Sequence, residues 1–102
     1  MNMKKQEKEF VIVRGPPGVY AGYLKSEDKG GSGNVELEDA FCLWKYSGAA
    51  SLNQLAMEGV KSPENCKFSV SVPLMRLKQI FQILPVSKEA KKNLLEVKRW
   101  RI

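Results

Sequence analysis

A chain of 102 residues, 43% of them hydrophobic, is long enough for one domain with a modest core, and no apolar run approaches the roughly 20 residues that span a bilayer. The chain has no histidine and no P-loop, nucleophile elbow or paired-carboxylate motif, which argues against metal, cofactor and triad chemistry and favours a binding protein over an enzyme. The net charge is +6, and most of the excess lies between Val86 and the C-terminus, which favours an anionic partner.

The first predicted elements are a charged lead-in and a strand that ends at a proline turn. Residues 1–9 are predicted to form a flexible N-terminus, and residues 10–102 a single α+β domain. Because the lead-in lacks the apolar segment of a signal peptide, the cytoplasm is the expected location. Residues 10–14 (FVIVR) are β-branched and apolar, which predicts a strand, and residues 15–18 (GPPG) end it.

A second strand is predicted over residues 19–26 (VYAGYLKS). Gly22 within it indicates a bulge or a close approach of two backbones. Residues 27–34 (EDKGGSGN) then predict a hairpin loop that contains Asp28. The two faces of this strand carry Val19, Ala21 and Tyr23 on one side, and Tyr20, Gly22 and Leu24 on the other.

The longest predicted strand covers residues 35–46 (VELEDAFCLWKY). One face is apolar throughout, whereas the other turns apolar only from Ala40, so we expect a strand that is exposed at its start and covered at its end. Apolar residues on both faces near its end exceed what one small core should cover, which predicts a homo-oligomer built from dimers, for example a hexamer. The first face carries Val35, Leu37, Phe41 and Leu43; the second carries Glu36, Glu38, Ala40, Cys42, Trp44 and Tyr46.

A capped helix is predicted over residues 51–59 (SLNQLAMEG), followed by a loop at residues 61–65. Ser51 is a suitable N-cap, Gln54 completes a capping box, and Gly59 is a C-terminal stop. The apolar stripe of this helix consists of Leu52, Leu55 and Ala56.

Residues 66–86 contain one clear strand and one ambiguous segment. In residues 66–72 (CKFSVSV) every second residue is apolar, which predicts a half-buried strand with Cys66, Phe68, Val70 and Val72 on one side. In residues 74–86 an apolar stripe at helical spacing competes with an apolar run before a proline. Helix and strand both stay open there, and we favour a strand over residues 79–86.

A second short helix is predicted over residues 87–97, with Ser87 as N-cap and Glu89 in the first turn. The whole chain is therefore predicted to be α+β, with an antiparallel sheet of about five strands and two short helices. The two cysteines, Cys42 and Cys66, are far apart in sequence and are expected to be inert thiols.

The most specific parts of the sequence are residues 44–67 (WKYSGAASLNQLAMEGVKSPENCK) and residues 83–90 (ILPVSKEA). With the rest of the chain after residue 9, they resemble a group of small phage and prophage proteins formerly known only as a domain of unknown function. That group is similar to the Thoeris anti-defence sponges and related phage decoys. The resemblance implies a protein that sequesters a cyclic ADP-ribose isomer or a cyclic oligonucleotide without cleaving it, in the infected bacterial cell and as an oligomer with pockets between protomers. Residues 15–18 and 27–34 depart from the group pattern, so the resemblance assigns no contacts to them.

The junction between the longest strand and the first helix is one candidate ligand site. Trp44 or Tyr46 could stack on a base, and the small residues that follow would let a phosphate approach backbone amides at a helix N-terminus. The structural alternative is that small residues before a capped helix are ordinary turn chemistry and that Trp44 belongs to the core. The small residues are Ser47, Gly48, Ala49 and Ala50, followed by the hydroxyl of Ser51.

The C-terminal KRWRI is a second candidate site. Arg99 and Arg101 could pair bidentately with phosphate oxygens, and Trp100 could offer a stacking face. In the alternative, Trp100 anchors the tail to the core and the arginines are solvated. Arg14, at the end of the first predicted strand, is a third candidate anion contact.

Three classes of function compete for this sequence. A non-enzymatic sponge for a cyclic nucleotide signal follows from the resemblance, the basic surplus and the missing catalytic residues. The alternative is a small basic phage protein that binds DNA or RNA through its C-terminus. A phosphodiester-cleaving enzyme is disfavoured by the lack of histidine, and no membrane partner is expected.

Overall fold

One antiparallel sheet and two α-helices make up the computed structural model, which describes residues 8–16, 18–28 and 30–102. The strands are Phe10–Gly15 (β1), Gly18–Glu27 (β2), Val35–Lys45 (β3), Lys67–Phe68 (β4), Val72–Leu77 (β5) and Gln82–Pro85 (β6). The helices are Leu52–Glu58 (α1) and Lys88–Leu95 (α2), with a 3₁₀ turn at Pro63–Asn65 (η2). The predicted α+β class is confirmed, with six strands in place of about five.

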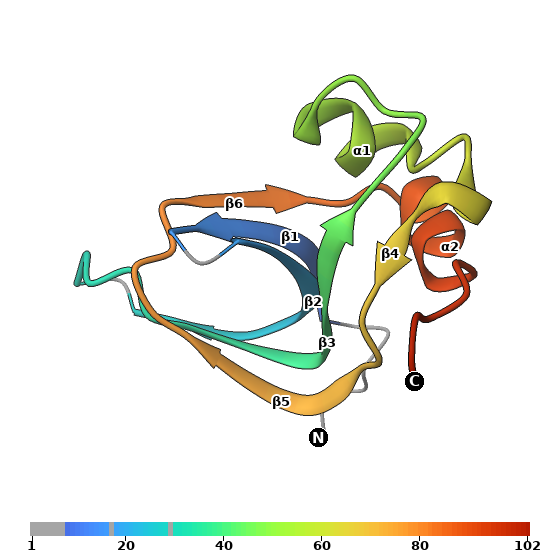
Figure 1. The fold of residues 1–102 in the computed structure, drawn as a ribbon. Helices are drawn as coiled ribbons and strands as arrows, with labels where there is room; N and C mark the ends of the chain where they lie inside the picture. Colours follow the sequence, from blue (N-terminus) through green and yellow to red (C-terminus); the bar gives the residue numbers. More distant parts are fainter. Residues whose placement is uncertain (1–7, 17, 29) are drawn as a thin grey trace.

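The strands neighbour one another in the order β4-β3-β2-β1-β6, and β5 also pairs with β3. The sheet curves strongly, and α1 and α2 lie next to each other at one end of it (Figure 1). One hydrophobic cluster fills the space between the sheet and the helices, and a second lies between the curved strands. Phe10 and Ile12 of β1 belong to the first cluster, and Val11 and Val13 to the second, which explains why the first four residues of this strand are all apolar.

A bulge in β3 switches the side to which its apolar residues point. Ala21 and Tyr23 of β2 pair with Phe41 and Glu38, so β3 contains one more residue than β2 between these two pairs. Leu37 therefore packs in the second cluster and Phe41 in the first. The prediction that these two residues share one face is wrong.

The bulge lies opposite Gly22, where the sequence predicted a bulge or a close backbone approach, and this prediction is confirmed. A Cβ atom at Gly22 would lie 3.0 Å from the Cβ of Ala40 and 3.0 Å from the carbonyl oxygen of Glu38. On β3 the distortion coincides with Asp39, whose φ is 49°. Aspartate is one of the few non-glycine residues that adopt this conformation readily.

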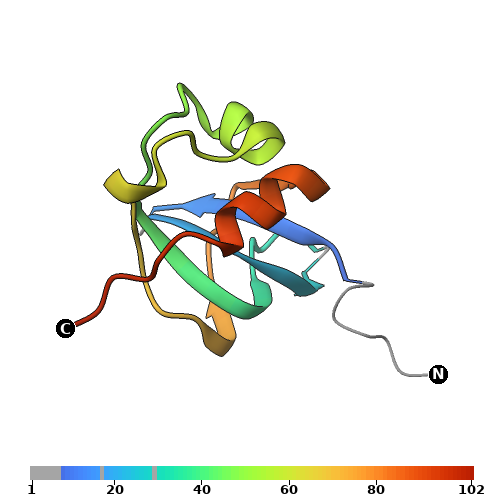
Figure 2. The same ribbon diagram turned by 90° about the vertical axis from the view of Figure 1, so that its right-hand side faces the viewer.

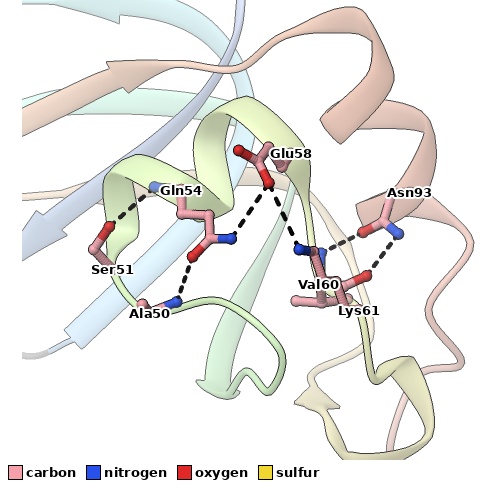
Figure 3. Close-up of polar contacts among 7 residues, drawn as sticks. All are labelled: Ala50, Ser51, Gln54, Glu58, Val60, Lys61 and Asn93. Carbon is pink, nitrogen blue, oxygen red and sulfur yellow. Dashed lines mark hydrogen bonds and ion pairs between the residues drawn. The ribbon is translucent and has the colours of Figure 1, made fainter.

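The helix α1 has the predicted N-cap at Ser51 and stop at Gly59 (Figure 3). Its Gln54 side chain, however, bonds the amide of Ala50, whereas a capping box would require a bond to the amide of Ser51. The hydroxyl of Ser51 accepts a hydrogen bond from the amide of Gln54 (3.1 Å), and the Gln54 side chain accepts one from the amide of Ala50 (2.7 Å). At the other end, Gly59 has a φ of 79° and its amide donates to the carbonyl of Leu55 (2.9 Å). The helix therefore begins and ends where its sequence predicts.

The second helix, α2, is fastened to the chain that leaves α1 (Figure 3). The amide of Val60 donates to Oδ1 of Asn93 (2.7 Å), and Nδ2 of Asn93 donates back to the carbonyl of Val60 (2.9 Å). Ser87 caps α2 as predicted, because its hydroxyl accepts from the amide of Ala90 (3.0 Å). The same hydroxyl donates to the carbonyl of Met57 (2.8 Å), so the cap also ties the two helices together.

Residues 66–86 form three short strands, which corrects two predictions. The expected strand over residues 66–72 is reduced to β4, and Val70 and Val72 are exposed. The ambiguous segment forms β5 and β6 around a turn at Gln79, whose φ is 61°, so the favoured strand over residues 79–86 holds only for β6. Within the described chain β5 and β6 each pair with one sheet neighbour, and they carry Pro73 and Pro85, respectively.

The structure describes the chain from residue 8 to its C-terminal residue, with gaps at residues 17 and 29. Residues 1–7 of the expected flexible N-terminus lie outside the described residues, as does Pro17 of the predicted proline turn. The carbonyl of Glu9 accepts a hydrogen bond from the amide of Leu24 (2.8 Å). No helix in the described part of the chain is long and apolar enough to cross a membrane.

Candidate functional site

The C-terminal segment after α2 returns to the sheet and brings two candidate aromatic residues together. The amide of Trp100 donates to the carbonyl of Phe68 (2.8 Å), so the segment runs beside β4 (Figure 2). The ring centroids of Trp44 and Trp100 lie 5.7 Å apart with their planes at 80°, an edge-to-face contact. Trp44 is 59% exposed and Trp100 49% exposed. This tryptophan pair (Trp44 and Trp100) therefore presents aromatic surface to solvent instead of closing the core.

An aromatic hollow of about 320 Å³ lies beside Trp44, and its walls include Tyr20, Cys42 and Tyr46. Burial raises the pKa of the Tyr20 hydroxyl, and the nearby Cys42 raises it further. Burial also raises the pKa of the Cys42 thiol, partly offset by a hydrogen bond with Ser69. Both groups are therefore neutral at pH 7, so the aromatic hollow suits an uncharged planar group.

A basic groove of about 590 Å³ lies beside Trp100. Three cations line it, Lys98, Arg99 and Arg101, against one carboxylate, Glu64. A fourth cation is close by, because Nζ of Lys67 lies 5.6 Å from the centroid of the Trp100 ring. Since Trp44 borders the aromatic hollow and Trp100 the basic groove, the tryptophan pair joins a neutral site to a cationic one.

The small residues of the junction have structural partners of their own. The amide of Ser47 donates to Sγ of Cys66 (3.3 Å), and its carbonyl accepts from the amide of Ser62 (3.4 Å). A Cβ atom at Gly48 would lie 2.6 Å from the backbone nitrogen of Lys61, so only glycine fits there. With the Ala50 amide and the Ser51 hydroxyl used in capping α1, turn and packing chemistry accounts for residues 47–51 without a ligand. Ala49 packs against the first hydrophobic cluster.

The arginines of the tail have different environments. Arg101 is exposed, as expected for a solvated side chain. Arg99 is half-buried instead, and its Cζ lies 3.9 Å from the centroid of the Phe41 ring and 5.7 Å from that of Phe68. The structural alternative, in which both tail arginines are solvated, is therefore wrong for Arg99.

Arg14 lies at the end of β1, and its Cζ lies 5.5 Å from the centroid of the exposed Phe81 ring. No contact in the described structure links Arg14 to the tryptophan pair. The described residues also contain no group of three or more His, Cys, Asp or Glu side chains that could hold a metal ion.

Sequence reasoning missed Lys67 and Tyr20 as site residues. Lys67 reaches Trp100 only because the C-terminal segment pairs with β4. Tyr20 reaches the aromatic hollow because it pairs with Cys42 across β2 and β3. Alternation along β2 gave the correct face for Tyr20. Nothing local in the sequence indicates that Tyr20 pairs with Cys42 of β3 or that the C-terminal segment pairs with β4.

These observations define a class: a small α+β protein with an exposed tryptophan pair between a neutral hollow and a basic groove. The chain belongs to the family described as "Domain of unknown function (DUF6948)", whose profile matches residues 8–94. The matched range includes Trp44 and the aromatic hollow and ends before Lys98, so the tail of the basic groove lies outside it. No curated protein and no solved structure matches the chain.

Proposed function

We propose that this protein binds a nucleotide at the tryptophan pair, with a base in the aromatic hollow and phosphate groups in the basic groove. The observation that carries the proposal is the contact between Trp44 and Trp100, which places two exposed aromatic rings between those two environments. Stacking a base on an aromatic side chain contributes roughly 1–3 kcal/mol in single-strand binders. The arginines and lysines of the groove suit phosphate oxygens.

The ligand that we propose is a cyclic nucleotide immune signal, either a cyclic ADP-ribose isomer or a cyclic oligonucleotide. The protein would act as a phage anti-defence sponge in the cytoplasm of the infected bacterial cell, as the sequence resemblance implies. A chain without histidine lacks the commonest general base, which supports binding without turnover. Sequestration of this kind needs no cofactor.

A homo-oligomer built from dimers remains part of the proposal, but the argument for it no longer depends on exposed apolar residues of the longest strand. Ala40, Phe41 and Leu43 are buried within one chain, so most of the apolar surface that predicted a partner is already covered. Ligand pockets bury most of a small ligand, whereas the aromatic hollow and the basic groove lie at the surface of one chain. A second copy of the chain, packed over the aromatic hollow and the basic groove, would enclose a ligand that one chain leaves exposed. Light scattering at micromolar concentration tests this, and a monomer mass with and without ligand would contradict it.

Single-stranded nucleic acid is the second candidate ligand. Exposed aromatic rings flanked by cations, as in the tryptophan pair with Lys67, are also the platform that single-strand binders use. A salt series separates the two ligands. Binding that neutralises several phosphates weakens steeply with salt, whereas a small recessed ligand responds less.

The sponge is tested by incubating the protein with a panel of cyclic nucleotides, removing free ligand, heating the complex and analysing what is released. We expect one cyclic nucleotide to return chemically intact. Trp100→Ala should release far less ligand, whereas Phe81→Ala, which removes an even more exposed aromatic ring beside Arg14, should release as much as the wild type. Release of an altered nucleotide would overturn sequestration, and equal losses in both variants would overturn the location of the site.

A further inference from the structure

Arg99 differs from every other cation in the described chain because a nitrogen of its guanidinium is buried without a partner. Its Nη1 is the one side-chain nitrogen or oxygen atom in the described residues that is buried and makes no hydrogen bond. The side chain stacks on Phe41 and also lies near Phe68, so the rings contact the face of the guanidinium and offer no acceptor to Nη1. No ion pair in the described structure includes Arg99.

The surroundings of this side chain leave its charge without compensation. Burial lowers the pKa of Arg99, and no neighbouring carboxylate opposes the effect. Along the basic groove Arg99 lies between Lys98 and Arg101, which add positive charge, and the one carboxylate of the groove, Glu64, makes no ion pair with it. A half-buried guanidinium with no counterion and with one buried N–H group unpaired destabilises a fold unless something else supplies the missing partner.

We infer that Arg99 binds an oxyanion of the phosphate class, which enters through the basic groove. The guanidinium is a planar fork that matches two oxygens of such an anion, and Arg99 itself lines the groove. Held against Phe41, the fork is already oriented, so little side-chain freedom is lost on binding. The inference deepens the proposed function, since a nucleotide phosphate is the anion that the proposed function would bring to this groove.

A purely structural role for Arg99 makes different predictions. If its stacking on Phe41 only anchors the tail, then an apolar side chain of similar length should pack less well and lower the melting temperature, and phosphate should have no specific effect. If instead Arg99 is an anion site, then Arg99→Met removes an uncompensated charge while its thioether still packs on the rings. The melting temperature of the variant in chloride should then equal or exceed that of the wild type.

The test is a titration of the wild type, Arg99→Met and Arg101→Met with inorganic phosphate against sodium chloride at matched ionic strength. At a phosphate concentration about five times its Kd, the melting temperature of the wild type should rise by about 4–8 °C more than that of Arg99→Met. Phosphate also stabilises proteins by exclusion from their surface, and the comparison with Arg99→Met removes that contribution. Arg101→Met, which takes a second cation from the same groove, should lose a smaller part of the response than Arg99→Met does, because solvent screens its exposed charge. An equal response in the wild type and Arg99→Met overturns the inference.

A second measurement uses the wild type alone, in case Arg99→Met does not fold. In a ¹H–¹⁵N spectrum the Nε–H resonance of Arg99 and the indole N–H of Trp100 should shift together and saturate with phosphate, while the indole N–H of Trp44 should shift less. An unchanged Arg99 resonance overturns the inference. If phosphate saturates this resonance and no nucleotide binds, the anion site stands and the proposed function fails. If a nucleotide binds and leaves the Arg99 resonance unchanged, the proposed function stands and the anion site fails.

Discussion

The junction at residues 47–51 and the C-terminal segment at residues 98–101 lie at the same end of the sheet but use their polar groups in opposite ways (Figure 1). In the junction, the amides of Ser47 and Ala50 and the hydroxyl of Ser51 all have partners within the chain. In the C-terminal segment, Nη1 of Arg99 has no hydrogen-bond partner among the described residues, and Trp100 is half-exposed. Small residues and a helix cap can thus be accounted for by the fold itself. Aromatic and cationic groups that the fold leaves unused are the stronger indication of a binding site.

The largest effect should come from Gly48→Ala, which tests whether the junction is structural. Gly48 has a φ of 87°, and an added Cβ would lie 2.6 Å from the backbone nitrogen of Lys61. Strain and overpacking together should lower the free energy of unfolding by about 2–4 kcal/mol, measured by urea denaturation. Gly31→Ala is the matched control, because Gly31 has a φ of 88° and nothing within 4 Å of the added atom. An equal loss in both variants would show that backbone conformation alone matters and that the contact with Lys61 does not.

The next largest effect should be on binding, through Trp44→Ala and Trp100→Ala. Each change removes an exposed stacking surface, so ligand affinity should fall by about 1–3 kcal/mol, or roughly five- to 150-fold. The free energy of unfolding should fall by only about 0.5–1.5 kcal/mol, the value of an edge-to-face contact. Calorimetry of ligand binding beside urea denaturation measures both quantities. Unchanged affinity in both variants would remove the tryptophan pair from the site.

The smallest effect should come from Ser51→Ala, which removes the cap of α1. The free energy of unfolding should fall by about 1 kcal/mol because the amide of Gln54 loses its acceptor. Ligand affinity should stay within twofold of the wild type, since the hydroxyl has a structural role. Ser51→Asp, which keeps an acceptor at the cap, should restore stability. A tenfold loss of affinity in Ser51→Ala at intact stability would return the junction to the ligand site.

Elements with local signals could be predicted from the sequence, and their predictions are confirmed. The caps at Ser51 and Ser87, the stop at Gly59 and the bulge at Gly22 each depend on residues a few positions apart. The face switch in β3 could not be predicted, because it depends on a positive φ at Asp39, which aspartate can adopt but does not require. The strand β5 was missed because it is stabilised by pairing with β3, about forty residues earlier in the chain.

In the candidate site, too, the two tryptophans could be identified as candidates from local sequence, whereas their contact could not be predicted. Trp44 and Trp100 were each chosen for local reasons, but their contact depends on one long-range pairing between Phe68 and the C-terminal segment. The partial burial of Arg99 depends on the same pairing, so neither of the two roles that the sequence left open for the tail indicated that its guanidinium stacks on Phe41 and leaves Nη1 without a partner. Arg14 was chosen for its charge and lies instead against Phe81.

The prolines of β5 and β6 affect the concentration that this protein can reach without aggregating. Under the proposed function the protein sequesters a signal stoichiometrically, so it would have to accumulate to at least the concentration of that signal. Crowded chains with open sheet edges risk pairing strand to strand into aggregates. Pro73 and Pro85 remove an amide donor from β5 and β6, each of which has a single sheet neighbour in the described chain, and so make those two edges poor templates for another copy. The open edges of this sheet are therefore compatible with a high concentration of the protein.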